Sequence, residues 1–465
     1  MKPTALLLSV LFFVTLAGAA ETRPNVVIIL ADDLGWADLA CYGNTFNETP
    51  HIDRLAREGL RFTQFYAGPV CSPTRANLQS GRDQARYGIT QHIPGHRRPF
   101  ARLIDPVVPL QLPLEVETFA ERLRPAGYVS GYFGKWHLGG DDHSPTQQGW
   151  DTAVEFTGNT VPPRLTGGDA TRRSADFLAR KAEDFIAANR DRPFVLQVSP
   201  SAVHIPLSTT PAKLEKYRAR KPMPGYPSRP DYAGLLEELD ECVGRIVAAV
   251  DRAGLAEKTL VLFLSDNGGL IHQQDGTIVT SNAPLRGEKG SLYEGGIRVP
   301  AIARWTGRIR AGGTTATPAL TMDIHPTLLA LAGVAPGQAQ PPDGMSLVPL
   351  FDQPSAALPR DTLTWHLPHY HHSTPASAIR RGDWKLIEFF ETDTVELYHL
   401  GHDRAETTNL AAREPARARE LRTALADWRR AVGARMPEPN PDYDPARAGE
   451  LGRPGAAKKK KAAGR

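Results

Sequence analysis

The chain has 465 residues, which is enough for one large domain and a second, smaller one. Hydrophobic residues make up 41% of it and charged residues 23%, and these fractions are ordinary for a globular protein. The formal net charge of +4 is small and evenly spread, which argues against nucleic acid as a partner. Only residues 458–461, four consecutive lysines, are strongly biased, and they lie in a tail that cannot bury a core.

The first 20 residues have the pattern of a secretory signal peptide. Lys2 precedes a short apolar stretch over residues 5–16, and small residues follow at 17–20. This stretch is too short to span a bilayer stably, and no later segment is apolar over a membrane-spanning length. We therefore expect a protein that is exported to the periplasm or secreted, without membrane insertion, and whose mature chain starts near residue 21.

The three cysteines, Cys41, Cys71 and Cys242, are too few for a disulfide framework in an exported protein of this size. Cys41 and Cys242 either pair with each other or remain two free thiols. Cys242 falls within an amphipathic helix pattern, which is compatible with a buried thiol. Both alternatives stay open from the sequence.

Apolar strands alternate with helical patterns over the first two thirds of the chain. The continuous apolar run at 25–30 predicts a strand that is buried on both faces, as in a parallel sheet. Strands are expected at 25–30, 128–133, 193–198 and 259–264, and helices around 52–56 and at 118–123, 174–188 and 232–253. The alternation predicts an α/β domain over residues 21–350, with a large, mainly parallel sheet sandwiched by helices. Ligands of such sheets bind at the carboxyl ends of the strands.

The character of the sequence changes after residue 350. Residues 383–390 and 395–400 have the pattern of two strands in a hairpin, and 415–432 that of a terminal helix. We therefore predict a small α+β subdomain over 351–437. The remaining residues, 438–465, are expected to form a disordered basic tail.

The most distinctive segment begins Cys71-Ser72-Pro73-Thr74-Arg75 and ends at Gly81-Arg82. A cysteine nucleophile is usually paired with a positioned histidine, whereas the neighbours of Cys71 are Pro, Thr, Arg and small residues. The segment resembles the signature of sulfatases, although Gln79 and Ser80 stand where that family usually has an apolar residue and Thr. The resemblance implies that a formylglycine-generating maturation enzyme oxidises Cys71 to Cα-formylglycine, an aldehyde whose hydrate attacks sulfur.

Two strand ends carry oxygen ligands. Asp32 and Asp33 are adjacent carboxylates that repel each other unless a cation lies between them, and Asp266 and Asn267 follow a second strand. Four hard oxygen donors suit Ca²⁺ or Mg²⁺ better than zinc. Taken alone, each pair would be a helix cap or a turn. Beside Cys71 they resemble the sulfatase metal site, which implies one Ca²⁺ bound by these four residues and the formylglycine at position 71.

Further segments strengthen the resemblance. Lys135 and His137 lie in Gly134-Lys135-Trp136-His137-Leu138-Gly139, which is similar to the second sulfatase signature. His204 lies in a His-x-Pro segment, and Lys289 follows Arg286-Gly287-Glu288, as in the Arg-Gly-x-Lys segment of the family. The match runs from about residue 23 to 410 and implies a sulfuric ester hydrolase with the alkaline-phosphatase-like fold.

The resemblance also implies roles for these residues. Arg75, Lys135 and Lys289 neutralise the oxygens of the sulfate ester, and Arg75 also holds residue 71. His204, helped by Lys289, protonates the leaving alcohol. His137 then takes a proton from the second hydroxyl of residue 71, so that sulfate leaves and the aldehyde is restored.

Two polar segments are candidates for the substrate rim. Residues 83–98 are rich in hydrogen-bond donors, and residues 365–372 contain four histidines. The histidine spacing fits no usual zinc site, so we expect a rim that faces a sugar. Both segments resemble those of exported bacterial sulfatases that act on sulfated glycans, which suggests a sulfated carbohydrate as substrate.

Two other functions stay open. The same superfamily includes formylglycine-dependent hydrolases of phosphonate or phosphate esters. A non-catalytic, glycan-binding relative is the second alternative, but such a protein should have lost the Cys, a metal carboxylate or a lysine, and every expected position is filled here.

Overall fold

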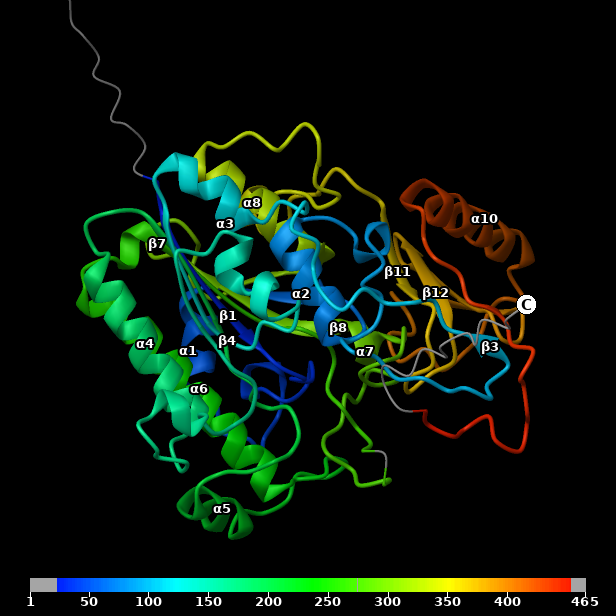
Figure 1. Cartoon of the computed structure of the whole chain (residues 1–465), viewed down its shortest axis with the longest axis horizontal. Helices are drawn as coiled ribbons and strands as arrows, with labels where there is room; N and C mark the ends of the chain where they lie inside the picture. Colours follow the sequence, from blue (N-terminus) through cyan, green and yellow to red (C-terminus); the bar gives the residue numbers. More distant parts are fainter. Residues whose placement is uncertain (1–22, 274, 453–465) are drawn as a thin grey trace, which may run out of the picture.

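The structure is a computed structural model that describes residues 23–273 and 275–452 (Figure 1). The predicted signal peptide and the four lysines at 458–461 lie outside the described residues.

A nine-stranded sheet forms the centre of the larger part of the chain, with the strand order β10-β2-β8-β7-β1-β6-β4-β5 and β9 paired to β2. Its strands are β1 Asn25–Ala31, β2 Leu60–Tyr66, β4 Val129–Gly134, β5 Thr152–Glu155, β6 Phe194–Ser199, β7 Thr259–Ser265, β8 Arg298–Arg304, β9 Gly313–Thr315 and β10 Ala319–Leu320. Every pairing is parallel except the two made by β8. The mainly parallel sheet expected from the sequence is therefore confirmed.

Helices cover both faces of this sheet (Figure 1). One face packs against α1 Pro50–Glu58, α4 Ser174–Ala188 and α6 Pro230–Arg252, and the other against α2 Cys71–Ser80, α3 Phe119–Leu123 and α8 Ile324–Ala332. Shorter helices are α5 Pro211–Arg218, α7 Glu294–Ile297 and α9 Val348–Asp352. Every residue of β1 and β7 is buried, which explains why these strands are continuous apolar runs.

The C-terminal part contains a four-stranded antiparallel sheet in the order β11-β12-β13-β14. Its strands are β11 Thr362–Leu367, β12 Ala376–Arg381, β13 Trp384–Phe389 and β14 Thr394–His399. The expected hairpin corresponds to β13 and β14, whereas β11 and β12 were not expected as strands. Helix α10 Pro415–Val432 packs on one face, and the other face packs against side chains of the larger part, such as Tyr66 and Ile297.

The segment after α10 differs from the expected disordered tail. Residues 438–452 run back along the larger part, where β15 Glu438–Pro439 pairs with β3 Leu103–Ile104. The Asn440 side chain donates hydrogen bonds to the backbone carbonyls of Pro99 and Ala101. These contacts join segments that are far apart in the sequence, and composition does not reveal them. Residues 453–465 lie outside the described part.

All three cysteines are free thiols, so Cys41 and Cys242 form no disulfide. Cys242 is buried on α6 within the core. Among residues 23–273 and 275–452, no helix combines the length and the apolar character needed to cross a membrane.

Candidate active site

The candidate residues from the sequence come together at the carboxyl ends of four neighbouring strands. Because the strands are parallel, their ends meet at one edge of the sheet, with β1 between β7 and β6. The site residues are Asp32 and Asp33 after β1, Lys135 and His137 after β4, His204 after β6, Asp266 and Asn267 after β7, Cys71 and Arg75 on α2, and Lys289 on the loop before α7.

The oxygen-bearing side chains form one buried cluster. The backbone N–H of Asp33 donates to Asp266 Oδ1 over 3.2 Å, and Asn267 Nδ2 donates to Asp33 Oδ1 over 2.8 Å. Asp33 has φ of 61°, a left-handed conformation that Asp tolerates better than most residues. Asp32 Oδ1 and Asn267 Oδ1 are buried and accept no hydrogen bond. Two buried oxygens without a donor fit a hard divalent cation such as Ca²⁺, which would supply their missing partner.

Asp32 and Asp33 each form an ion pair with a lysine. Lys135 Nζ lies 2.6 Å from Asp32 Oδ2, and Lys289 Nζ lies 2.8 Å from Asp33 Oδ1. Burial raises the pKa of both aspartates, but Lys135 and Lys289 outweigh it and hold these pKa values below the usual range. Burial and the neighbouring Asp32 carboxylate raise the pKa of Asp266 to about 8. The cluster therefore carries charges of both signs packed closely together and shielded from water.

Arg75 connects three parts of the site. Its Nε and Nη2 donate to Asp266 Oδ2 over 3.0 and 2.7 Å, and its Nη1 donates to the carbonyl of Lys135. The guanidinium is 1% exposed and makes no hydrogen bond to Cys71 within the described residues. Arg75 thus fixes the ends of β4 and β7 relative to α2.

Cys71 is the first residue of α2 and is 1% exposed. Its Sγ lies 3.2 Å from His137 Nδ1. His137 Nε2 lies 2.6 Å from the carbonyl oxygen of Ile93, which can only accept, so Nε2 carries the proton. Nδ1 therefore presents its lone pair to the side chain at position 71. Burial, followed by the nearby Lys135, lowers the pKa of His137 to about 4, so the imidazole is neutral at pH 7.

His204 lies at the open side of the cluster, with its side chain 31% exposed. Its Nδ1 hydrogen-bonds with the carbonyl of Ile205, and the carbonyl accepts. Nε2 consequently points into the site, 3.6 Å from Asp33 Oδ2. This is the place where a departing group would leave toward solvent.

Ser72 and Ile93 are site residues that the sequence did not reveal. Ser72 Oγ donates to the carbonyl of His137 over 2.9 Å and accepts from the backbone N–H of Ile93 over 3.1 Å. Ile93 acts through its carbonyl, which no side-chain pattern encodes. The Ile93 carbonyl holds the imidazole of His137, and Ser72 connects the backbones of His137 and Ile93.

The two expected rim segments lie against each other. Thr90 Oγ1 is 2.8 Å from His369 Nε2, and Arg98 Nη2 donates to the carbonyl of His371 over 3.2 Å. Residues 83–98 come from the larger part and 365–372 from the C-terminal part, so both parts build this side of the site.

Known proteins are similar to this chain over most of its length. Residues 24–334 match the sulfatase family, and residues 287–430 match the C-terminal region of N-sulphoglucosamine sulphohydrolase. A sulfatase of Formosa agariphila is 31% identical, over 88% of this chain and 89% of its own. Human arylsulfatase A is 35% identical, over 80% of this chain and 76% of its own. The solved structure of Ps i-CgsB in complex with k-i-k-neocarrahexaose has a TM-score of 0.75 and 25% identity, over 91% of this chain and 95% of that one.

With the fold, the clustered motifs and these matches in agreement, the chain belongs to the sulfatase family. It is a sulfuric ester hydrolase with the α/β architecture of that family.

Proposed function

We propose that the protein hydrolyses sulfate esters of a carbohydrate, using one Ca²⁺ and a Cα-formylglycine made from Cys71. The observation that carries this proposal is the lone pair of His137 Nδ1, which faces the side chain at position 71 from 3.2 Å within a buried cluster of carboxylates and cations. A neutral imidazole in that position can accept a proton from a hydroxyl on residue 71.

Asp32, Asp33, Asp266 and Asn267, together with residue 71, would hold the Ca²⁺. The buried oxygens of Asp32 and Asn267 that accept no hydrogen bond support this ligand set. The bound ion would supply positive charge against the oxygens of the sulfate, and the hydrated aldehyde would supply the hydroxyl nucleophile.

The chain's own groups would perform the remaining tasks. Lys135 and Lys289 are buried ammonium groups, and ion pairs with Asp32 and Asp33 raise their pKa values although burial lowers them. They stabilise negative charge on the sulfate oxygens in a site with little water. His204 Nε2 lies at the open side. As an imidazolium, with its Nδ1–H donated to the carbonyl of Ile205, His204 would give the proton on Nε2 to the leaving alcohol and become neutral.

The proposal of a carbohydrate substrate is supported by two observations. The rim is polar and is contributed by both parts of the chain, which suits a large ligand with many hydroxyl groups. Ps i-CgsB, which shares the fold over most of this chain, has been solved with a neocarrahexaose bound.

The test begins with the mass of the peptide that covers Cys71, from protein co-expressed with a formylglycine-generating enzyme. Conversion should lower the mass by about 18 Da, since the CH₂–SH group becomes CHO. The converted protein should then hydrolyse 4-nitrophenyl sulfate and sulfated oligosaccharides, and Cys71→Ala should not.

Other outcomes point to the alternatives. Faster hydrolysis of a phenyl phosphonate than of the sulfate would favour a phosphonate or phosphate ester hydrolase. A converted protein that binds sulfated oligosaccharides but hydrolyses none would be a binding module. Export is part of the proposal, and N-terminal sequencing of the mature protein should begin near residue 21.

A further inference from the structure

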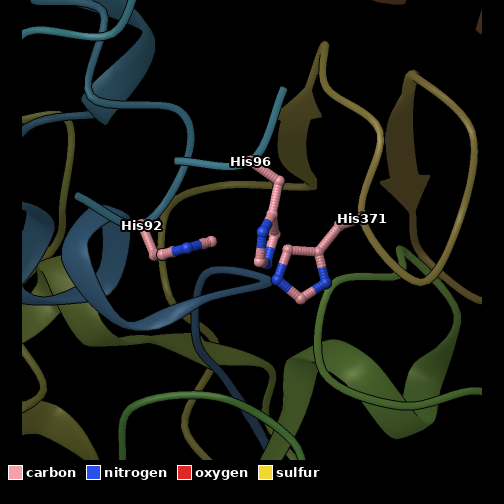
Figure 2. Close-up of side chains that lie close together, drawn as sticks. All are labelled: His92, His96 and His371. Atoms are coloured by element: carbon pink, nitrogen blue, oxygen red, sulfur yellow. The ribbon is translucent and has the colours of Figure 1, made fainter. Parts of the chain in front are cut away.

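The side chains of His92, His96 and His371 converge in one cluster (Figure 2). The ring centroids of His92 and His96 are 4.5 Å apart, and those of His96 and His371 are 5.1 Å apart. One nitrogen from each ring can be chosen so that all three lie within 4.8 Å of one another. The proposed chemistry at residue 71 does not use these nitrogens, although the three residues belong to the polar rim proposed for the sugar.

The fold, and not the local sequence, creates this cluster. His92 and His96 lie four residues apart on a loop of the larger part, and His371 follows β11 in the C-terminal part. Figure 2 shows the rings of His92 and His371 on either side of that of His96. A search for local zinc spacing fails here because one ligand comes from a segment that is distant in the sequence.

The hydrogen bonds of Gln91 fix the tautomer of His92. Gln91 Oε1 accepts the backbone N–H of His92 over 3.1 Å and lies 3.0 Å from its ring Nδ1. Because this oxygen is an acceptor, Nδ1 must carry the ring proton, and Nε2 keeps its lone pair. Gln91 is itself buried and donates through Nε2 to the carbonyl of Tyr370. A hydrogen-bond acceptor on the ring nitrogen that does not bind the metal is typical of metal-binding histidines.

Burial disfavours the charged form of all three rings. Burial, with a smaller contribution from His96, lowers the pKa of His92 to about 2. Burial likewise lowers the pKa values of His96 and His371.

The enclosed carboxylate of Asp105 lies near enough to His96 to act on the charge of its ring. Both oxygens of Asp105 are enclosed and accept no hydrogen bond among the described residues, although His369 Nδ1 is 3.9 Å away. Burial lowers the pKa of His96, whereas Asp105 acts in the opposite direction, so this negative charge reaches the cluster. It offsets part of the repulsion that Lys289 and Arg98 would exert on a bound cation.

We propose that His92, His96 and His371 form a second metal site, which binds a borderline divalent ion of the Zn²⁺, Co²⁺ or Ni²⁺ type. Imidazole nitrogens favour these ions, whereas the oxygen cluster at Asp32 favours Ca²⁺, so the two sites select different metals. Zinc–nitrogen bonds of about 2.0–2.1 Å place tetrahedral ligands about 3.3 Å apart. The rings must therefore approach one another by rotation of their side chains. Three protein ligands leave a fourth position open to water or to an oxygen of the substrate.

The test is a titration of the full chain, saturated with Ca²⁺, with Co²⁺ and then Zn²⁺. We expect one equivalent of Co²⁺ with the visible absorption of a tetrahedral or five-coordinate ion, displaced by Zn²⁺. His96→Ala and His371→Ala should abolish this binding, and Gln91→Leu should weaken it by about 10–100-fold. His402→Ala is the matched control, because it removes an exposed histidine from another ring pair and should leave binding unchanged.

A measurement on the unmodified chain guards against variants that fail to fold. Diethyl pyrocarbonate modifies accessible imidazoles, and Zn²⁺ should protect His92, His96 and His371 in the mapped peptides but not His402. The proposal is wrong if Co²⁺ does not bind, if binding survives His96→Ala, if Cys71→Ala removes it, or if Zn²⁺ leaves the three histidines unprotected. None of these readouts depends on sulfatase activity, so the metal site and the proposed function fail separately.

Discussion

His137 and Ile93 are joined by a hydrogen bond of 2.6 Å between the imidazole Nε2 and the backbone carbonyl, and this bond decides which ring nitrogen faces Cys71. The geometry is fixed without any charged partner for the histidine. It leaves a neutral base at the position where the proposed chemistry needs one.

His137→Ala should therefore reduce kcat for sulfate ester hydrolysis by about 10²–10⁴-fold, the usual contribution of a general base. The measurement is steady-state hydrolysis of 4-nitrophenyl sulfate by protein whose conversion at position 71 has been checked by mass. The control is His143→Ala, which removes a histidine outside the cluster. Activity of His137→Ala within a few-fold of the parent would contradict the assigned role.

Removal of Ca²⁺ should lower the thermal stability of the protein. An ion that binds only the folded chain stabilises it by about 2.7 kcal/mol when present at 100 times its Kd. Differential scanning calorimetry in EGTA and in excess Ca²⁺ should show this shift for the parent. Asn267→Ala should lose it, because the variant lacks the buried Oδ1. His137→Ala should keep it, and equal shifts in all three proteins would place the ion elsewhere.

Asp83 should make stability depend on pH. It is buried, and this burial, together with the nearby Asp343, raises its pKa to about 7, although the N–H of Ala85 lowers it. An unfolded Asp ionises near pH 3.9, so the folded state holds the proton more tightly between these values. The stabilisation of the folded state by the Asp83 proton is full below about pH 4 and is lost as the pH rises through 7. The free energy of unfolding changes over this range by at most about 1.4 kcal/mol per pH unit.

Asp83→Asn keeps the acceptor for Ala85 and removes the titration. The Tm of Asp83→Asn minus that of the parent should therefore rise between pH 5 and pH 8. A difference that is constant over this range would mean that Asp83 is ionised throughout.

Lys385 should be essential for the stability of the contact between the two parts of the chain. Its Nζ lies 3.0 Å from Glu294 Oε1 and 2.8 Å from Glu406 Oε1, and all three side chains are fully buried. Lys385→Met leaves two buried carboxylates without this cation, at a cost of about 3–5 kcal/mol. The exposed Lys216 also pairs with two glutamates, but Lys216→Met should cost about 1 kcal/mol or less. Calorimetry of both variants would show similar Tm values if burial did not matter here.

The sequence predicts the fold well where periodicity is strong. Strands β1 and β7 are nearly continuous apolar runs because both of their faces are buried. The long pattern of α6 follows the buried side of that helix. Strands β11 and β12 were not predicted because three of their buried residues, His366, Ser377 and Arg380, are polar. The alternation of apolar and polar residues that marks a half-buried strand is therefore hidden in this segment. The course of 438–452 depends on backbone pairing with residues more than 300 positions away, and composition does not encode it.

The residues of the candidate site were likewise only partly predictable from the sequence. Its charged side chains lie in motifs with fixed spacing at strand ends, so resemblance to a family identifies them. The support from the Ile93 carbonyl and from Ser72 has no such motif. The meeting of His96 with His371 depends on how the C-terminal part docks, which is a tertiary property.

The burial of Cys71 bears on the order of events in synthesis. The thiol is 1% exposed and opens a helix in which every residue is buried, so another protein has no access to it in the folded chain. A maturation enzyme would have to act while this segment is still extended, before α2 packs against the sheet. The proposed conversion would then have to be faster than the folding of this segment. In a chain that folded before conversion, Cys71 would remain a thiol permanently.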